Sequence, residues 1–171
     1  MPISIATIQE AATRVRKSTR RTFYEAKASN LATAFLCHSH KDVALVKGIS
    51  NMLEDSGWDV YIDWEDSSMP ETPDRQTALN IQSKIKDLKY FLFLATANSM
   101  SSRWCPWEIG YANGVKNIEN ILIIPTTDRF GTASGNEYLQ LYRSVDIATG
   151  GGLAVWQPGQ SNNGVSVRTL R

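Results

Sequence analysis

Cysteine and histidine are both scarce in this sequence, which contains two of each. A structural zinc site needs three or four ligands at convergent spacing, and a disulfide framework needs several cysteines. His38 and His40 lie next to Cys37, whereas Cys105 is distant in the chain. With no secretory signal at the start, we expect both cysteines to be free thiols in a reducing compartment. We therefore predict a cytoplasmic protein without a metal site.

Long apolar runs and a strong net charge are also missing. No run approaches the roughly 20 apolar residues of a membrane helix, so no membrane span is expected. The net charge is +1 and the basic residues after position 30 are dispersed, which argues against a nucleic-acid partner. Apolar residues make up 42% and charged residues 20%, which are values typical of globular proteins. The length of 171 residues predicts one domain and leaves no room for a fused sensor or effector domain.

Several catalytic signatures are absent from the sequence. It has no Gly-x-Ser-x-Gly motif and no Walker loop, so neither a hydrolase triad nor a P-loop NTPase is indicated. Asp63 lacks the paired acidic residues that would hold magnesium beside a phosphoacceptor. Three successive glycines at 150–152 predict a turn, and we expect the tail after Pro158 to be loosely held on the surface.

The N-terminal segment has the pattern of an amphipathic helix. Its apolar residues recur at helical spacing, at Ile5, Ile8, Ala12 and Val15. Basic residues crowd the following turns, so we predict one helix over 4–27 within an N-terminal extension, 1–30. Three interpretations stay open: a helix packed on the domain or on a second subunit, an arm for an anionic surface, or an organelle-targeting segment.

From Leu31 onward, short apolar strands alternate with helical segments, which predicts an α/β fold with βαβ crossovers. The run at 90–95 is apolar without alternation, as expected for a strand that is buried on both faces. Pro125 is expected to end the fourth strand. The predicted strands are 32–37, 58–62, 90–95, 121–124 and 144–148, and the predicted helices are 42–55, 74–88 and 137–141.

Ligands of an open parallel sheet bind beyond the carboxyl ends of its strands. This rule selects four loops, at 37–42, 63–73, 95–108 and 125–135. The third loop leads into a helix that we expect Ser101 or Ser102 to cap.

Glu108 falls near the start of this helix, where the helix dipole favours an ionised carboxylate. Trp104 precedes it by four residues, so the two side chains share a helix face. A planar ring could stack on the indole while its sugar hydroxyls reach the carboxylate. The alternative is a capped helix whose tryptophans pack on the sheet and whose glutamate is solvated.

Three segments occur in an order that resembles a TIR (Toll/interleukin-1 receptor) domain. They are Ala34-Phe35-Leu36-Cys37-His38-Ser39-His40-Lys41-Asp42, Gly57-Trp58-Asp59-Val60-Tyr61-Ile62-Asp63, and the stretch from Ser101 to Ala112. The resemblance extends over about 33–147. Its most specific part is Ser-x-Trp-Cys-x-x-Glu, in which Trp104, Cys105 and Glu108 are similar to the pattern of bacterial TIR proteins.

The resemblance implies a flavodoxin-like, three-layer α/β domain over 31–171 with a five-stranded parallel sheet. For the enzymatic branch of the family it implies cleavage of NAD+ at the nicotinamide-ribose bond, with no cofactor beyond NAD+ as the substrate. Glu108 corresponds to the catalytic glutamate and Trp104 to the aromatic position beside the substrate. The other implied NAD+ contacts come from the first loop and from the start of the mobile loop called BB: Cys37, His38, Ser39, Tyr61, Asp63 and Trp64.

One carboxylate can suffice for this reaction, because nicotinamide leaves a cationic ring as a neutral molecule and no general acid is needed. The product stays open between linear, cyclic and conjugated ADP-ribose. Standalone bacterial relatives such as those of Thoeris anti-phage systems imply a homo-oligomer and a separate effector that senses the product. The competing interpretations are a TIR-TIR adaptor without turnover and a nucleoside-processing transferase of similar fold.

Overall fold

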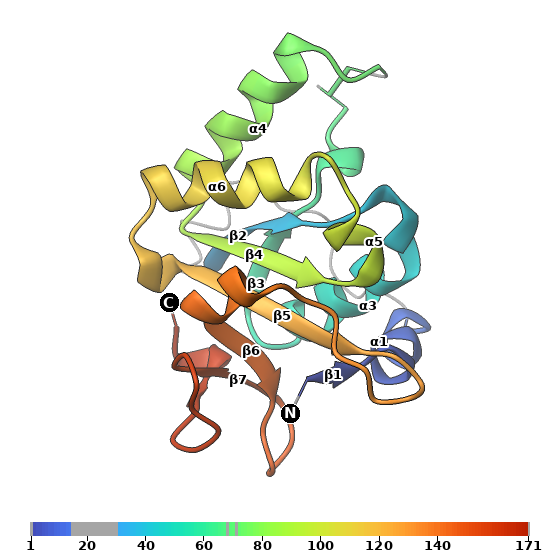
Figure 1. Cartoon of the computed structure of the whole chain (residues 1–171), viewed down its shortest axis with the longest axis vertical. Helices are drawn as coiled ribbons and strands as arrows, with labels where there is room; N and C mark the ends of the chain where they lie inside the picture. The colour runs from blue at the N-terminus through green and yellow to red at the C-terminus, as the bar shows by residue number, and fades with distance from the viewer. Residues whose placement is uncertain (1, 15–30, 68, 71, 171) are drawn as a thin grey trace.

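The computed structural model describes residues 2–14, 31–67, 69–70 and 72–170. In this part of the chain a central sheet separates two helical layers (Figure 1). One layer contains α1 (Ile5–Ala12) and α3 (Val43–Glu54), and the other contains α4 (Arg75–Asp87) and α6 (Cys105–Val115). Each layer has its own apolar core against one face of the sheet, so the three-layer prediction is confirmed.

Five parallel strands form the centre of the sheet, in the order β3-β2-β4-β5-β6. This is the flavodoxin-like order, in which the second strand along the chain lies outside the first. Every residue of β2 and β4 is buried, as the uninterrupted apolar runs predict. The bounds are β2 Ala32–Cys37, β3 Trp58–Tyr61, β4 Tyr90–Ala95, β5 Ile121–Thr127 and β6 Arg143–Ile147.

Three further strands extend the predicted five-stranded sheet. β1 (Ile3–Ser4) pairs in parallel with the end of β5, while β7 (Leu153–Trp156) and β8 (Val165–Ser166) add antiparallel strands beyond β6. The prediction of a loosely held tail after Pro158 is therefore wrong. Val167 is fully buried, and its carbonyl accepts a hydrogen bond of 2.9 Å from the Trp58 indole N–H.

Pro125 lies inside β5 and does not end it, contrary to the sequence-based expectation. It forms the last pair with β4, opposite Ala95. The next residue, Thr126, donates its hydroxyl to the Ala95 carbonyl over 2.6 Å and pairs with Ile3 of β1. The strand continues because β1 pairs with it beyond the end of β4.

The N-terminal helix is shorter than predicted. α1 ends at Ala12, and Thr13 forms a turn with its hydroxyl on the Glu10 carbonyl, so a continuous helix over 4–27 is wrong. Residues 15–27 lie outside the described residues. Ile8 is fully buried against α3, and the Ile8 carbonyl would stand 2.0 Å from a Cβ at Gly48. The apolar face of α1 therefore packs on the domain itself.

Short helical turns connect the main elements. None of the helices in the described part of the chain is long and apolar enough to cross a membrane. Gly57 adopts a φ of 85° at the end of the turn between α3 and β3, a left-handed conformation that favours glycine. The short elements are η1 (His40–Asp42), η2 (Asp63–Glu65), α5 (Ala97–Met100), η3 (Ile118–Asn120), η4 (Glu137–Leu141) and η5 (Val167–Thr169).

Candidate active site

A cavity of about 390 Å³ opens at the carboxyl ends of β2 and β3, between η2, α4 and the start of α6. The strand order reverses between β2 and β4, and the lining includes residues that follow each of these strands: His38 after β2, and Ser102 and Trp104 after β4. This is the position expected for a ligand site in a sheet of this topology. Five of the eight residues implied by the resemblance line it. These are His38, Asp63, Trp64, Trp104 and Glu108.

Glu108 lies in the first turn of α6 and is only 5% exposed. Burial raises the pKa of this carboxyl from 4.5 to about 8, although a hydrogen bond from the Cys37 thiol and the charge of His38 act in the opposite direction. The expectation that the helix dipole keeps Glu108 ionised is therefore wrong. Desolvation outweighs the partial charge of a helix terminus, which contributes only about 0.3–1 kcal/mol at exposed sites.

Trp104 precedes α6 and lines the cavity beside Glu108. The hydroxyl of Ser102 accepts hydrogen bonds from the backbone N–H groups of Trp104 and Cys105, over 3.2 and 3.4 Å. Ser102 thus satisfies two N–H groups at the start of α6, but the N-cap position itself is Trp104, which makes no side-chain capping bond, so the predicted N-cap residue is wrong. The indole of Trp104 meets the ring of Trp107 edge-on, with 5.4 Å between centroids, and this contact holds its plane beside the cavity.

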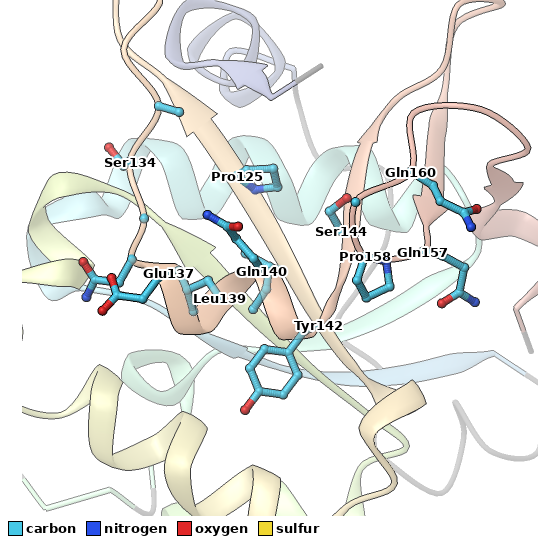
Figure 2. Close-up of a pocket in the computed structure, with 15 residues that line it drawn as sticks. Pro125, Ser134, Glu137, Leu139, Gln140, Tyr142, Ser144, Gln157, Pro158 and Gln160 are labelled. Carbon is cyan, nitrogen blue, oxygen red and sulfur yellow. The ribbon is translucent and has the colours of Figure 1, made fainter.

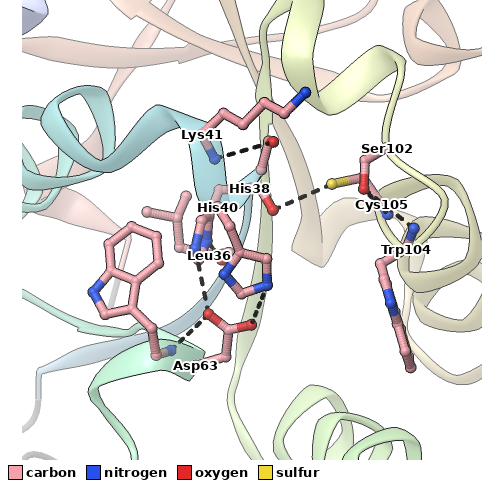
Figure 3. A network of polar contacts seen from close by, with 10 residues as sticks. Leu36, His38, His40, Lys41, Asp63, Ser102, Trp104 and Cys105 are labelled. Carbon is pink, nitrogen blue, oxygen red and sulfur yellow. Dashed lines mark hydrogen bonds and ion pairs between the residues drawn. The ribbon is translucent and has the colours of Figure 1, made fainter. Parts of the chain in front are cut away.

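His38 and the half-buried Asp63 form an ion pair in the cavity lining, with 3.3 Å between Nε2 and Oδ1 (Figure 3). The other ring nitrogen of His38 lies 2.7 Å from the Leu36 carbonyl. A carbonyl can only accept, so Nδ1 carries a proton and Nε2 faces the carboxylate. Burial lowers the pKa of His38, but Asp63, the Leu36 carbonyl and Glu108 together raise it more, so the net pKa lies above its usual value.

The same ion pair acts on Asp63 and on the loop that follows it. Burial raises the pKa of Asp63, but His38, His40 and the Trp64 backbone N–H together lower it more, so the net pKa lies below its usual value. Asp63 also accepts the backbone N–H of Trp64 over 2.7 Å. Trp64 packs edge-on against His38 with 4.3 Å between ring centroids. The end of β2 and the start of the 63–73 loop are thereby joined.

Three residues implied by the resemblance lie outside the cavity lining. Cys37 is fully buried beneath it, and Ser39 accepts the Lys41 backbone N–H at the start of η1. Tyr61 donates its hydroxyl to Asp66 over 2.7 Å, with the ammonium of Lys84 4.9 Å from its ring centroid. These side chains support the loops around the cavity.

The structure adds lining residues that were not singled out from the sequence. Asp66 and Met69 belong to the 63–73 loop, which was selected only as a whole, and Ile81 was assigned to an apolar helix face. No sequence signal separates a cavity-facing isoleucine from a core isoleucine. The further lining residues are His40, Ser67, Pro70, Pro73, Thr77 and Ser102.

A second cavity, of about 680 Å³, lies beside η4 and the segment after β7 (Figure 2). Glu137 is the one charged residue among its described lining residues, and the others are amides, hydroxyls and apolar groups. It contains no paired titratable groups comparable to those of the first cavity. Within the described ranges, no group of three or more His, Cys, Asp or Glu residues is arranged to hold a metal ion.

Comparison with known proteins identifies the family. The TIR domain model matches residues 34–151. The chain is 34% identical over 117 residues to "Probable 3' cyclic ADP-D-ribose synthase ThsB'" of Bacillus cereus (strain MSX-D12), covering 67% of this chain and 61% of that protein.

It is also 28% identical over 81 residues to "Putative cyclic ADP-D-ribose synthase TIR2" of Cytobacillus dafuensis, covering 46% of this chain and 21% of that protein. The chain therefore spans less than two thirds of the length of either relative. The family match covers more than half of the chain and includes the strands, η2 and α6 that surround the first cavity. The chain belongs to the TIR domain family.

Proposed function

We propose that this TIR domain cleaves the bond between nicotinamide and ribose in NAD+, with Glu108 as the catalytic carboxylate. The observation that carries the proposal is a buried glutamate on the floor of a cavity, beside an indole that can stack on a planar ring. Both relatives carry names of cyclic ADP-D-ribose synthases, which supports the same chemistry.

The charges of the cavity suit the nicotinamide end of the substrate. Its lining includes the carboxyl groups of Asp63, Asp66 and Glu108, and the described lining residues include no lysine or arginine. A cationic nicotinamide ring is attracted to this environment, while the pyrophosphate is not. We therefore expect nicotinamide and its ribose inside the cavity, and the pyrophosphate at the mouth near His40, whose side chain is 70% exposed.

The raised pKa of Glu108 fits a role that begins when substrate binds. The empty site favours the neutral acid, because burial penalises the anion. A cationic ring placed beside the carboxyl group favours the anion, so binding promotes loss of the proton. The carboxylate then opposes the positive charge that develops on the ribose as the glycosidic bond breaks.

Bond cleavage leaves its electron pair on the nicotinamide nitrogen, and nicotinamide departs as a neutral molecule. A nucleophile then attacks the oxocarbenium-like ribose, either on the face opposite the departed nicotinamide or on the face that nicotinamide has left. Water gives ADP-ribose and releases a proton, whereas attack by a group of the same molecule, either a hydroxyl of the adenosine ribose that loses its proton or a nitrogen of the adenine ring, gives a cyclic product. We propose a cyclic ADP-ribose product, in line with the names of the relatives.

The cellular role that we propose is signalling in anti-phage immunity, in which the product acts on a separate effector protein. The resemblance to standalone TIR proteins of Thoeris systems supports this setting, as does the name of the Bacillus cereus relative, a probable 3' cyclic ADP-D-ribose synthase. We also propose a cytoplasmic location and assembly through TIR-TIR contacts. NAD+ serves as the substrate, and no further cofactor is proposed.

Chromatography of the products formed from NAD+ by the purified protein tests the proposal. The expected result is stoichiometric release of nicotinamide together with a cyclic ADP-ribose isomer. Equal amounts of nicotinamide and linear ADP-ribose would retain the cleavage and reject the cyclisation. If concentrated and clustered protein released no nicotinamide, the enzymatic proposal would be rejected in favour of a TIR-TIR adaptor.

A further inference from the structure

Two buried thiols lie directly beneath the candidate active site. Cys37 is the last residue of β2 and Cys105 is the first of α6, and both are buried, at 1% and 0% exposure. The Cys105 thiol donates to the His38 carbonyl over 3.3 Å (Figure 3). The Cys37 thiol donates to the Cys105 carbonyl over 3.9 Å. Each thiol therefore contacts a backbone carbonyl on the opposite element.

These contacts fix the part of α6 that carries Glu108. The backbone N–H of Glu108 bonds to the Trp104 carbonyl over 2.9 Å, so the carboxylate is attached to the turn that begins at Cys105. Cys37 also acts on the Glu108 carboxyl group, because it favours the anion and so lowers the pKa of Glu108. Neither thiol belongs to the cavity lining, so neither contacts a molecule bound in the cavity. Their contacts are with the elements that hold the carboxylate.

We propose that Cys37 and Cys105 are positioning residues for Glu108. The two thiols hold the first turn of α6, which carries Glu108, against the end of β2. The inference rests on the proposed function, because it assigns the thiols to the residue that acts there. The side chain at position 37 should therefore influence the pKa of Glu108, and with it the pH at which the enzyme becomes active.

The direction of this effect follows from the groups that face Glu108. Cys37 and His38 at the end of β2 favour its anion, whereas Asp63 in η2 and Cys105 in α6 disfavour it. The Nε2 of His40 lies 4.0 Å from the Asp63 carboxylate, so His40 also borders these groups. A thiol is a weak hydrogen-bond donor, and burial raises the pKa of Cys37 so that it keeps its proton. A hydroxyl at position 37 would bond the anion more strongly, and a methyl group would not bond it at all.

The test compares the pH dependence of kcat for nicotinamide release in wild type, Cys37→Ser and Cys37→Ala. We expect the midpoint of the acid limb to move to lower pH in Cys37→Ser and to higher pH in Cys37→Ala, by about half a pH unit or more in each case. KM should stay within about threefold of wild type, because residue 37 does not contact substrate.

Thr126→Val is the matched control. It removes a buried hydroxyl that donates to the Ala95 carbonyl over 2.6 Å, outside the cavity lining. Its acid limb should coincide with that of wild type, even if its melting temperature falls. A purely structural role for Cys37 would likewise lower the melting temperature and leave the midpoint unchanged.

Coincident pH profiles for wild type and Cys37→Ser would overturn the proposal, as would shifts of both variants in the same direction. If Cys37→Ala does not fold, the comparison of wild type with Cys37→Ser remains decisive. If no variant cleaves NAD+, the proposed function fails, but the positioning of Glu108 stays measurable. Titration of ¹³C-labelled glutamate by NMR should then still give a lower pKa for Glu108 in Cys37→Ser than in wild type.

Discussion

The burial of Glu108 predicts that stability depends on pH in a way that Glu108→Gln removes. Glutamine keeps the shape of the side chain but cannot ionise. In wild type the pKa of Glu108 is about 8 in the folded protein, compared with 4.5 as the usual value. The folded state therefore binds a proton in the interval between these values that the unfolded state has lost.

The sign and size of the effect follow from this difference. Below about pH 4.5, Glu108 is protonated in both the folded and the unfolded state, so its ionisation does not lower the free energy of unfolding. As the pH rises, the free energy of unfolding falls by about 1.4 kcal/mol per pH unit until the folded state also ionises. Full ionisation costs the fold about 5 kcal/mol, and about 3 kcal/mol is already lost at pH 7. Glu108→Gln should escape this loss.

Urea unfolding of wild type and Glu108→Gln from about pH 4.5 to about pH 9 measures the difference directly. Most other titrating groups cancel, because both proteins contain them. We expect the variant to gain stability over wild type steadily with pH and to level off above about pH 8. A difference that stays constant over this range would refute a buried, uncharged Glu108.

Other changes test separate parts of the structure. Trp104→Ala should fold and should raise KM for NAD+ about 5- to 150-fold, because base-aromatic stacking contributes about 1–3 kcal/mol; an unchanged KM in steady-state kinetics would remove the indole from the substrate site. Gly48→Ala places a Cβ 2.0 Å from the Ile8 carbonyl and should lower stability by about 2 kcal/mol or more in urea unfolding, and a neutral result would show that α1 does not pack closely on α3. The stability difference between wild type and Asp63→Asn should be largest between about pH 4 and pH 6.5, where both Asp63 and His38 are charged. The stabilisation by the ion pair is lost at low pH, as the pH falls through the lowered pKa of Asp63. It is also lost at high pH, as the pH rises through the raised pKa of His38. Equal differences at pH 5 and pH 9 would argue against the ion pair.

The parallel sheet could be predicted from the sequence because its strands are local and strongly apolar. The runs at 32–37 and 90–95 match β2 and β4 at every residue. The C-terminal strands could not be predicted in the same way. β8 contains only two residues, and Val167 is buried by contacts that include Trp58, far away in the sequence. The alternation signal needs about four residues, so such a strand leaves no pattern.

The residues of the candidate site were easier to predict than their electrostatics. Trp104 and Glu108 lie four residues apart in the sequence motif, and both line the cavity. The protonation of Glu108 depends on its burial and on groups that are distant in sequence, such as Cys37 and Asp63. A helix-dipole argument uses only neighbours along the chain. It therefore missed the desolvation that dominates the pKa.

Nicotinamide release by wild type and Glu108→Gln tests the central claim most directly. We expect wild type to release nicotinamide from NAD+. Glu108→Gln should bind NAD+ with similar affinity in calorimetry, but its kcat should be lower by about a hundredfold or more. The loss follows because glutamine cannot oppose the charge that develops on the ribose. A folded Glu108→Gln protein that released nicotinamide at a rate near that of wild type would show that Glu108 is not the catalytic carboxylate.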